Sequence, residues 1–188
     1  MAAVVPNWFI ALVLPEQSGW ERCAVELPMG MRRFHPEDLH LTVAFLGSCG
    51  EERAHQAWAS LASERHPPIP VTAGSWRAMG APRSPSAYAL TLAEGRAPTA
   101  ALMADWGRRA LTVAAQPVDG RSPLPHVTLA RPTRRLRDQL REPMDHWLRT
   151  APVPTTPVTL EHLALYTWAE DRSQRLFRQV AVRSLAGA

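Results

Sequence analysis

Two stretches of the 188-residue chain repeat one pattern, and this repeat restricts the fold more than any other feature of the sequence. Residues 40–44 read His-Leu-Thr-Val-Ala and residues 126–130 read His-Val-Thr-Leu-Ala. Side chains alternate between the two faces of a β-strand, so His and Thr of each stretch share a face, about 7 Å apart. The apolar residues between them face the other side, where a helix can cover them. If an approximate twofold axis relates the two halves of the chain, both His–Thr pairs converge on a cleft.

The remaining sequence mixes strand-like and helical segments without strict alternation of the two. Apolar runs and turn residues predict strands at 8–14, 39–46, 71–79, 87–92, 126–130, 158–168 and 176–182. Amphipathic spacing and proline positions predict helices at 15–27, 51–64, 97–114 and 134–148. This order favours an α+β fold with mainly antiparallel sheet. We expect residues 1–188 to form a single bilobal domain, with intertwined lobes of approximately residues 1–95 and 96–188.

The basic residues exclude several classes of enzyme. All 21 are arginine, and the chain contains no lysine. A covalent lysine–nucleotidyl intermediate, a Schiff base and a Walker-type phosphate loop are therefore excluded. The formal net charge of +4 and the pI of about 10.0 suit an anionic substrate, but the charges are too scattered to establish nucleic-acid binding.

The cysteines and the apolar runs indicate the cellular compartment in which the protein is expected. Cys23 and Cys49 lie far apart with no CxxC motif, which predicts neither a disulfide framework nor a zinc site. Pro6 and Asn7 interrupt the first apolar run, no basic region precedes it, and no run reaches the ~18 apolar residues of a membrane span. We expect a cytoplasmic monomer that needs no membrane and no obligatory protein partner.

The paired residues suggest a particular chemistry. Histidine has a free pKa of about 6.5, so it serves as general acid or general base near neutrality. Two histidines on opposite sides of a phosphorus atom allow in-line attack on a phosphodiester, and two threonine hydroxyls can hydrogen-bond the non-bridging oxygens. Two histidines without a nearby carboxylate or thiolate are an incomplete set of metal ligands, so we expect no metal and no cofactor. A single His-x-Thr would indicate only a core histidine; the second copy makes the chemical interpretation the stronger one.

The same segments resemble a known family. Residues 36–47, Pro-Glu-Asp-Leu-His-Leu-Thr-Val-Ala-Phe-Leu-Gly, resemble the first signature of bacterial RNA 2′,3′-cyclic phosphodiesterases. This family is also called the 2′-5′ RNA ligase family and belongs to the two-histidine phosphoesterase superfamily. Residues 125–131, Pro-His-Val-Thr-Leu-Ala-Arg, resemble the second signature (HxTx motif). The resemblance covers most of the chain, because the strand ending Leu14-Pro15 and the strand with Leu165-Tyr166 also fit.

The resemblance implies a function and a set of site residues. It implies a bilobal α+β fold that hydrolyses 2′,3′-cyclic phosphate ends of RNA or cyclic nucleotides to 2′-phosphomonoesters. His40 is then the proton donor to the leaving 3′-oxygen, and His126 is the proton acceptor that activates water. Thr42 and Thr128 hold the phosphate. The paired motif alone leaves the two histidine roles interchangeable.

Phe45 and Arg131 occupy equivalent positions, five residues after their histidines. The resemblance implies that they contact the base, and that Arg131 also reaches phosphate. Strict alternation places both on the face away from the histidines, so this role requires the strands to twist or end before them, as Gly47 and Pro132 permit. Without the resemblance, the sequence indicates only that Phe45 is a core residue and that Arg131 is solvated.

Other residues receive weaker assignments. Phe177 and Trp168 differ from the residues usual in the family and are expected at the rim, where they would affect base preference. Arg131 and the neighbouring arginines at 134, 135 and 137 could contact an RNA backbone, although a solvated helix start explains them better. The remaining histidines are expected at the surface; they are His35, His55, His66, His146 and His162.

Two alternative functions stay open at this point. The same cleft could cleave 2′-5′ phosphodiester bonds, or form them without ATP by reversal of the acid–base cycle. The chain could also be an RNA- or nucleotide-binding module with little catalysis, which the threonine beside each histidine disfavours.

Overall fold

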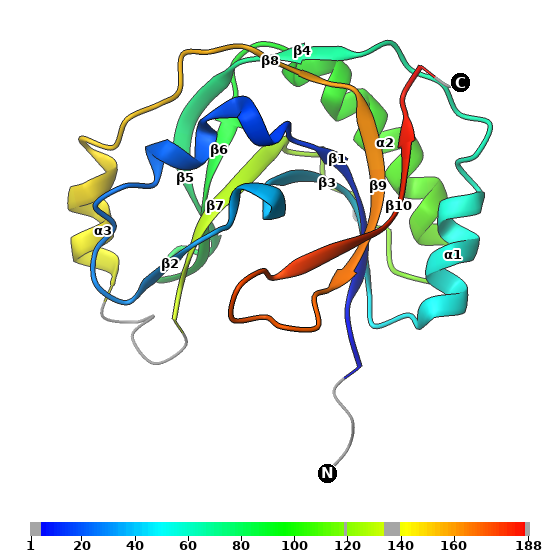
Figure 1. Cartoon of the computed structure of the whole chain (residues 1–188), viewed down its shortest axis with the longest axis horizontal. Helices are drawn as coiled ribbons and strands as arrows, with labels where there is room; N and C mark the ends of the chain where they lie inside the picture. Colours follow the sequence, from blue (N-terminus) through cyan, green and yellow to red (C-terminus); the bar gives the residue numbers. More distant parts are fainter. Residues whose placement is uncertain (1–4, 119, 134–139, 187–188) are drawn as a thin grey trace.

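Two four-stranded antiparallel sheets form the framework of the molecule (Figure 1). The computed structural model describes residues 5–118, 120–133 and 140–186. Sheet A has the order β10 (Phe177–Ser184), β9 (His162–Trp168), β1 (Trp8–Val13), β3 (His40–Gly47). Sheet B has the order β2 (Met31–Arg33), β7 (His126–Pro132), β6 (Ser84–Leu92), β5 (Ala73–Ala81), and a short pair joins β4 (Ile69–Val71) to β8 (Val158–Leu160). The predicted α+β class with antiparallel sheet is confirmed.

Each sheet takes strands from both halves of the chain. Sheet A combines β1 and β3 with β9 and β10, and sheet B combines β2, β5 and β6 with β7. The two repeated strands therefore lie in different sheets, and β3 and β7 pack against each other. Figure 1 shows the two sheets side by side, with β7 of sheet B and the edge strand β3 of sheet A near the middle of the molecule. The single-domain assignment with lobes near 1–95 and 96–188 stays a prediction.

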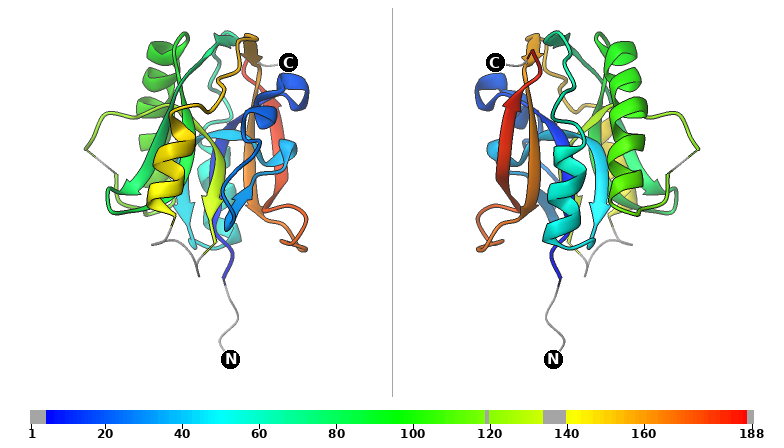
Figure 2. Two further views of the ribbon diagram at one scale, coloured as in Figure 1. Left: turned by 90° about the vertical axis from the view of Figure 1, so that its left-hand side faces the viewer. Right: turned by 90° about the vertical axis from the view of Figure 1, so that its right-hand side faces the viewer.

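Helices cover the sides of the sheets that face away from the repeated His and Thr residues. α1 (Glu51–Ala59) packs on β1 and on α2 (Arg96–Val113), and α2 packs on β3. In both views of Figure 2, the strands of the two sheets stand beside each other, with α1 and α2 on the outside of the molecule. α3 (Arg141–Leu148) lies against sheet B, where Trp147 meets Trp76 with ring centroids 4.9 Å apart.

One hydrophobic core joins most of these elements. It includes buried residues of β1, β3, β9, α1 and α2, together with Leu90, Val127 and Leu129 of sheet B. A second, smaller cluster places Tyr88 of sheet B against Met144 and Trp147 of α3. The apolar residues between His and Thr in both repeated strands are buried in the main core, as the alternation predicts.

Several predicted elements need correction. The helix expected at 15–27 is wrong, because this segment forms two 3-10 turns, η1 (Glu16–Ser18) and η2 (Trp20–Cys23), separated by Gly19 in the left-handed conformation (φ 72°). The strand expected at 158–168 is two strands, β8 and β9, that pair with different partners. The three-residue strand β2 and a third 3-10 turn, η3 (Pro36–Asp38), were not predicted. Of the helix expected at 134–148, residues 134–139 lie outside the described residues.

Each repeated strand carries a β-bulge at the same place. In β3, Thr42 and Ala44 oppose the consecutive residues Ala11 and Ile10 of β1, so Val43 is the extra residue. In β7, Thr128 and Ala130 oppose the consecutive residues Ala89 and Tyr88 of β6, so Leu129 is the extra residue. A bulge puts two residues opposite one and reverses the facing of every later side chain.

None of the helices in the described part of the chain is long and apolar enough to cross a membrane.

Candidate active site

The two repeated strands present their His and Thr side chains in the same way. His40 and Thr42 in β3 are half-buried, and so are His126 and Thr128 in β7. From the histidine onward, the two strands share one sequence of burial: half-buried, buried, half-buried, two buried, then exposed. The contact between β3 and β7 brings the two pairs together. His126 lies close enough to His40 for its charge to lower the pKa of His40.

The backbone orients both imidazoles identically. Nδ1 of His40 lies 2.6 Å from the carbonyl oxygen of Asp38, and Nδ1 of His126 lies 2.7 Å from the carbonyl oxygen of Leu124. A carbonyl only accepts, so Nδ1 carries the hydrogen in both rings and the neutral imidazole has its lone pair on Nε2. Each histidine thus offers Nε2 for proton transfer, and the chain segment just before each strand fixes the ring.

Aromatic rings enclose His40. The imidazole stacks on Phe9 with ring centroids 4.7 Å apart, and Tyr166 and Phe177 lie 5.4 and 5.5 Å away. Burial among these rings lowers the pKa of His40 from its ordinary 6.5 to about 4, although the hydrogen bond to Asp38 opposes the shift. The positive charges of Arg131 and His126 lower this pKa further. His40 is therefore a neutral imidazole near pH 7 when the cleft holds no anion.

The bulges bring Phe45 and Arg131 to the same face as the histidines. Both side chains are exposed, five residues after His40 and His126 respectively. Phe45 pairs with Phe9, whose ring contacts His40, and Arg131 lies with its guanidinium 5.3 Å from the ring of Phe34. Neither strand ends before these residues; the extra residue of each bulge reverses the alternation and increases the local twist, which is the first of the two expected possibilities.

A cavity of about 330 Å³ opens beside these groups. It brings together the predicted residues His40, Thr42, Phe45 and Arg131, as well as Trp168 and Phe177, which were expected at the rim. Asn7, Phe9 and Arg172 complete the lining and were not predicted. His126 and Thr128 do not line this cavity; they stand on the neighbouring strand. The missed residues carry no motif, and only the antiparallel pairing of β1, β9 and β10 brings them here.

Asp38 supports the His40 side of the cavity and was also missed. The residue is 1% exposed, and its carboxylate accepts hydrogen bonds from the backbone N–H groups of Leu176 and Phe177 at 2.8 and 3.1 Å. The backbone carbonyl oxygen of Asp38 accepts the hydrogen bond from Nδ1 of His40. Asp38 thereby connects the start of β10 to the catalytic candidate His40. Its place two residues before the histidine is visible in the sequence, but its buried partners are not.

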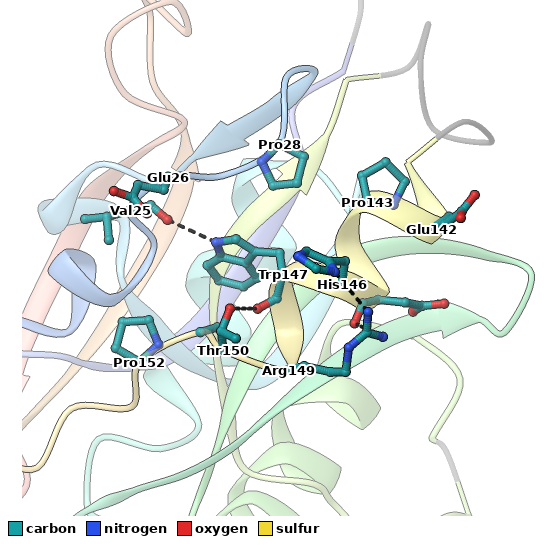
Figure 3. Close-up of a pocket in the computed structure, with 12 residues that line it drawn as sticks. Val25, Glu26, Pro28, Glu142, Pro143, His146, Trp147, Arg149, Thr150 and Pro152 are labelled. Carbon is teal, nitrogen blue, oxygen red and sulfur yellow. Dashed lines mark hydrogen bonds between the residues drawn. The ribbon is translucent and has the colours of Figure 1, made fainter.

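A larger cavity, of about 900 Å³, lies beside α3, and neither His40 nor His126 lines it (Figure 3). Figure 3 shows Trp147 at its centre, with the indole N–H donating to the carbonyl of Val25 at 3.1 Å. Its lining holds one arginine, Arg149, against three carboxylates, those of Glu26, Glu142 and Asp145. An anionic substrate is repelled by such a lining, so the smaller cavity next to His40 is the better candidate for phosphate chemistry.

The remaining expectations about polar residues have mixed outcomes. Four of the five histidines expected at the surface are exposed, and His66 is half-buried against Trp106 with centroids 6.4 Å apart. The arginines at 134, 135 and 137 lie outside the described residues. Among the residues that the structure does describe, no three His, Cys, Asp or Glu side chains gather into a group suited to a metal ion.

Comparison with known proteins gives a family match and a set of similar structures. A family model described as "LigT like Phosphoesterase" matches residues 20–87, which include the strand with His40 and end before the strand with His126. A search of curated proteins found no match.

Solved structures match almost the whole chain at low identity. The crystal structure of E. coli LigT with 3′-AMP has a TM-score of 0.70 and 21% identity, over 96% of this chain and 98% of that one. E. coli LigT with NADP+ has a TM-score of 0.66 and 20% identity, over 98% and 99% of the two chains. A protein of Thermus thermophilus has a TM-score of 0.63 and 22% identity, over 96% and 98%. Residues 20–87 are thus similar to the LigT-like phosphoesterase family, and the chain as a whole has the fold of E. coli LigT.

Proposed function

We propose that this protein is a phosphoesterase that hydrolyses 2′,3′-cyclic phosphate ends of RNA or nucleotides to 2′-phosphomonoesters, without a metal ion. The observation that carries the proposal is the duplicated strand. Two His–Thr pairs on contacting strands have the same burial, the same bulge and the same hydrogen bond that frees Nε2. In-line displacement at phosphorus needs one base and one acid on opposite sides, and this pair of strands supplies two equivalent candidates.

The reaction follows from these groups. One imidazole takes a proton from water through Nε2 while the water oxygen bonds to phosphorus. The bond from phosphorus to the 3′-oxygen breaks, and the other imidazole, protonated beforehand, gives its proton to that oxygen. The hydroxyls of Thr42 and Thr128 donate to the non-bridging oxygens, where negative charge accumulates in the transition state. Arg131 adds a positive charge beside the same oxygens.

The resemblance assigns His40 as the donor and His126 as the acceptor. The pKa of His40, lowered to about 4 mainly by burial, favours the neutral ring and thus an acceptor role in the empty cleft. A bound phosphate opposes this shift, because its negative charge stabilises an imidazolium. The donor role of His40 therefore requires that the imidazole takes up a proton when the substrate binds.

Other proteins of this fold support a nucleotide substrate, without specifying the reaction. Structures of E. coli LigT contain 3′-AMP, ATP and NADP+, all of which are nucleotides. A nucleotide substrate is consistent with the arginine-lined cavity beside His40.

The test is hydrolysis of adenosine 2′,3′-cyclic phosphate and of an RNA that ends in a cyclic phosphate, both with EDTA present. We expect 2′-monophosphate products and unchanged rates in EDTA. Cleavage of a 2′-5′-linked dinucleotide, with no action on cyclic phosphates, would support the alternative function in the same cleft. Binding of both substrates without turnover would make the protein a binding module and refute the proposal.

A substrate with sulfur at the leaving 3′ position distinguishes the two histidine roles. A thiolate leaves without protonation, so a variant that lacks the general acid regains activity on this substrate. With His40 as donor, His40→Ala is rescued and His126→Ala is not. Rescue of His126→Ala alone reverses the assignment, and rescue of neither removes general acid catalysis by the pair.

A further inference from the structure

Asn7 lines the cavity beside His40 and has no role in the cleavage step. It is the only asparagine of the 188-residue chain. The residue is half-buried, and in the described part of the chain its carboxamide forms no hydrogen bond with another residue. A carboxamide that loses part of its water without gaining a partner is costly. A cavity that holds one is therefore suited to a ligand with matching polar groups.

The backbone fixes Asn7 at one end of the cavity. β9 pairs with β1 up to Phe9, and continuing this pairing by two residues puts Asn7 opposite Trp168 (Figure 1). The hydroxyl of Thr167, a residue that is 2% exposed, donates to the backbone carbonyl of Asn7 at 3.2 Å. Alternation along the strand puts Asn7 on the same face as Phe9, about 7 Å further along. Because Phe9 stacks on His40, Asn7 belongs to the same surface as the reaction centre.

Two aromatic residues stand beside this amide. Phe45 is 56% exposed and pairs with Phe9. Trp168 is half-buried, and the guanidinium of Arg172 stacks on its indole at 4.2 Å, which holds the ring in place. Both rings line the cavity together with Asn7. Every nucleic-acid base has a flat face that stacks on aromatic side chains, so this end of the cavity can hold a base whose edge points to the amide.

The residue proposed to hold the phosphate lies nearer to His40. The pairing of β1 with β3 puts Thr42 opposite Ala11 and Phe45 opposite Phe9, so Phe45 lies between Thr42 and the Asn7 end of β1. In a nucleoside 2′,3′-cyclic phosphate the ribose separates the phosphorus from the base. The lining of the cavity continues from Thr42 toward Asn7. A phosphate at Thr42 therefore has its base toward Phe45 and Asn7.

A carboxamide distinguishes adenine from guanine. Its oxygen accepts and its NH₂ group donates, side by side, and this pattern matches the N6 amino group and N7 of adenine. Guanine presents two acceptors, O6 and N7, at the same edge. A pyrimidine has one ring to stack on the aromatic side chains where a purine has two. The amide and the rings together therefore favour adenine.

We propose that Asn7 determines the base specificity of the protein by hydrogen-bonding the N6 amino group and N7 of adenine. The substrate is then an RNA end or a nucleotide whose terminal residue is adenosine 2′,3′-cyclic phosphate. This inference rests on the proposed function, since it names the base that adjoins the cyclic phosphate. Asn7 is a binding residue in this scheme and takes no part in proton transfer.

Three substrates with the same cyclic phosphate test the contact to the base. They are the 2′,3′-cyclic phosphates of adenosine, of guanosine and of purine riboside, which lacks the N6 amino group and keeps both rings. In the wild-type protein we expect adenosine to have a KM about tenfold lower than the other two with a similar kcat, because an amide left without its partner costs roughly one power of ten in affinity. A KM for either of the other substrates equal to that of adenosine would overturn the proposal.

Asn7→Leu keeps the size of the side chain and removes its donor and its acceptor. We expect KM for the adenosine substrate to rise about tenfold, to the value for purine riboside, with little change in kcat. Because Thr167 bonds to the backbone of Asn7, the substitution keeps that contact. Gln17→Leu is the matched control, because Gln17 is an exposed carboxamide that does not line the cavity. An equal rise for all three substrates would make Asn7 a structural residue and overturn the proposal.

An NMR measurement separates the failure of this proposal from the failure of the proposed function. Since the chain has only one asparagine, selective isotope labelling of asparagine gives a single pair of side-chain NH₂ signals. We expect saturating 3′-AMP to shift this pair, and the 3′-monophosphate of purine riboside to shift it much less. If the protein turns over none of the cyclic phosphates, the cyclic phosphodiesterase proposal fails, but such a difference still supports the role of Asn7. Equal shifts with the two ligands, or no shift with either, would overturn that role.

Discussion

His40 and His126 come from one sequence pattern, but their surroundings differ. Both rings are fixed through Nδ1 by a carbonyl two residues earlier in the chain. His40 also lies among Phe9, Tyr166 and Phe177, and this enclosure is the main reason for its lowered pKa. The pKa of His40 is thus set by long-range packing around the ring, which the local sequence pattern does not determine.

The low pKa of His40 has a consequence for stability. The unfolded chain binds a proton at His40 below about pH 6.5, whereas the folded protein binds it only below about pH 4. The unfolded state therefore holds more protons between these values, and the free energy of unfolding falls as the pH drops through this range, by on the order of 1–3 kcal/mol. Urea unfolding at pH 7 and pH 4.5 measures the effect.

The control for this prediction compares two histidine variants. His40→Asn should lose part of the pH dependence of the unfolding free energy, because the group that causes it is gone. His162→Asn, which changes an exposed histidine, should keep the wild-type dependence. The same pH dependence in wild type and His40→Asn would contradict the account of His40.

Asp38 provides the second prediction for a single residue. Asp38→Asn puts an NH₂ group against one of two buried backbone N–H donors, so one donor loses its acceptor. We expect the free energy of unfolding to fall by about 1–3 kcal/mol, the cost of an unsatisfied buried polar group. Because Asp38 also positions His40, the NMR titration of His40 should shift in this variant.

Asp105→Asn is the matched control, since Asp105 is an exposed aspartate on α2. Its effect should stay within about 0.5 kcal/mol, as for most surface substitutions. If Asp38→Asn behaves like the control in both measurements, Asp38 does not hold β10 against His40.

At the scale of secondary structure, the matching bulges in β3 and β7 decide the composition of the cleft. They turn Phe45 and Arg131 toward the histidines, and without them both side chains would lie on the helix-covered face. The bulge in β3 also needs room on that face. The carbonyl oxygen of Val43 lies 2.6 Å from where a Cβ on Gly107 would be, so α2 approaches the bulge at a glycine.

Gly107→Ala tests this contact. Alanine is normally about 1 kcal/mol better than glycine within a helix, but here the new methyl group meets a backbone atom that cannot rotate away. We expect a net loss of about 1–3 kcal/mol in unfolding free energy, as in other overpacked positions. Gly120→Ala adds its methyl group in open space and should be nearly neutral. A stabilising Gly107→Ala would show that α2 does not press on the bulge.

These elements also show what the sequence could and could not predict. The pattern of His, apolar, Thr, apolar and Ala was sufficient to predict the strands β3 and β7, because the alternation of side chains along a strand depends only on neighbouring residues. The bulges were not predictable, since Val43 and Leu129 look like ordinary strand residues. The segment 15–27 has helical composition, yet Gly19 adopts a left-handed conformation that limits it to single turns. Arg172, in the turn between β9 and β10, was not predictable either, because it reaches the cavity only through long-range pairing of these strands.

At the scale of the whole molecule, the two sheets bring two distant strands into contact. Sheet A supplies His40 and the aromatic residues around it, and sheet B supplies His126 and Arg131. Arg32 of sheet B donates to the carbonyl oxygens of Arg172 and Ser173, in the turn between β9 and β10 of sheet A, so the two sides of the cleft are connected next to the cavity. The proposed chemistry therefore belongs to the pair of sheets, and neither sheet contains both histidines.

The central claim is that His40 and His126 act as one unit on a single phosphorus atom, and a double-mutant comparison tests it most directly. Turnover of adenosine 2′,3′-cyclic phosphate is measured for His40→Ala, His126→Ala and the variant with both changes. Each single change should reduce kcat by roughly 10²–10⁴, and the double variant should be about as slow as the slower single variant, because residues that act in one step are not additive. Unchanged turnover in either single variant, or losses that multiply in the double variant, would contradict the claim.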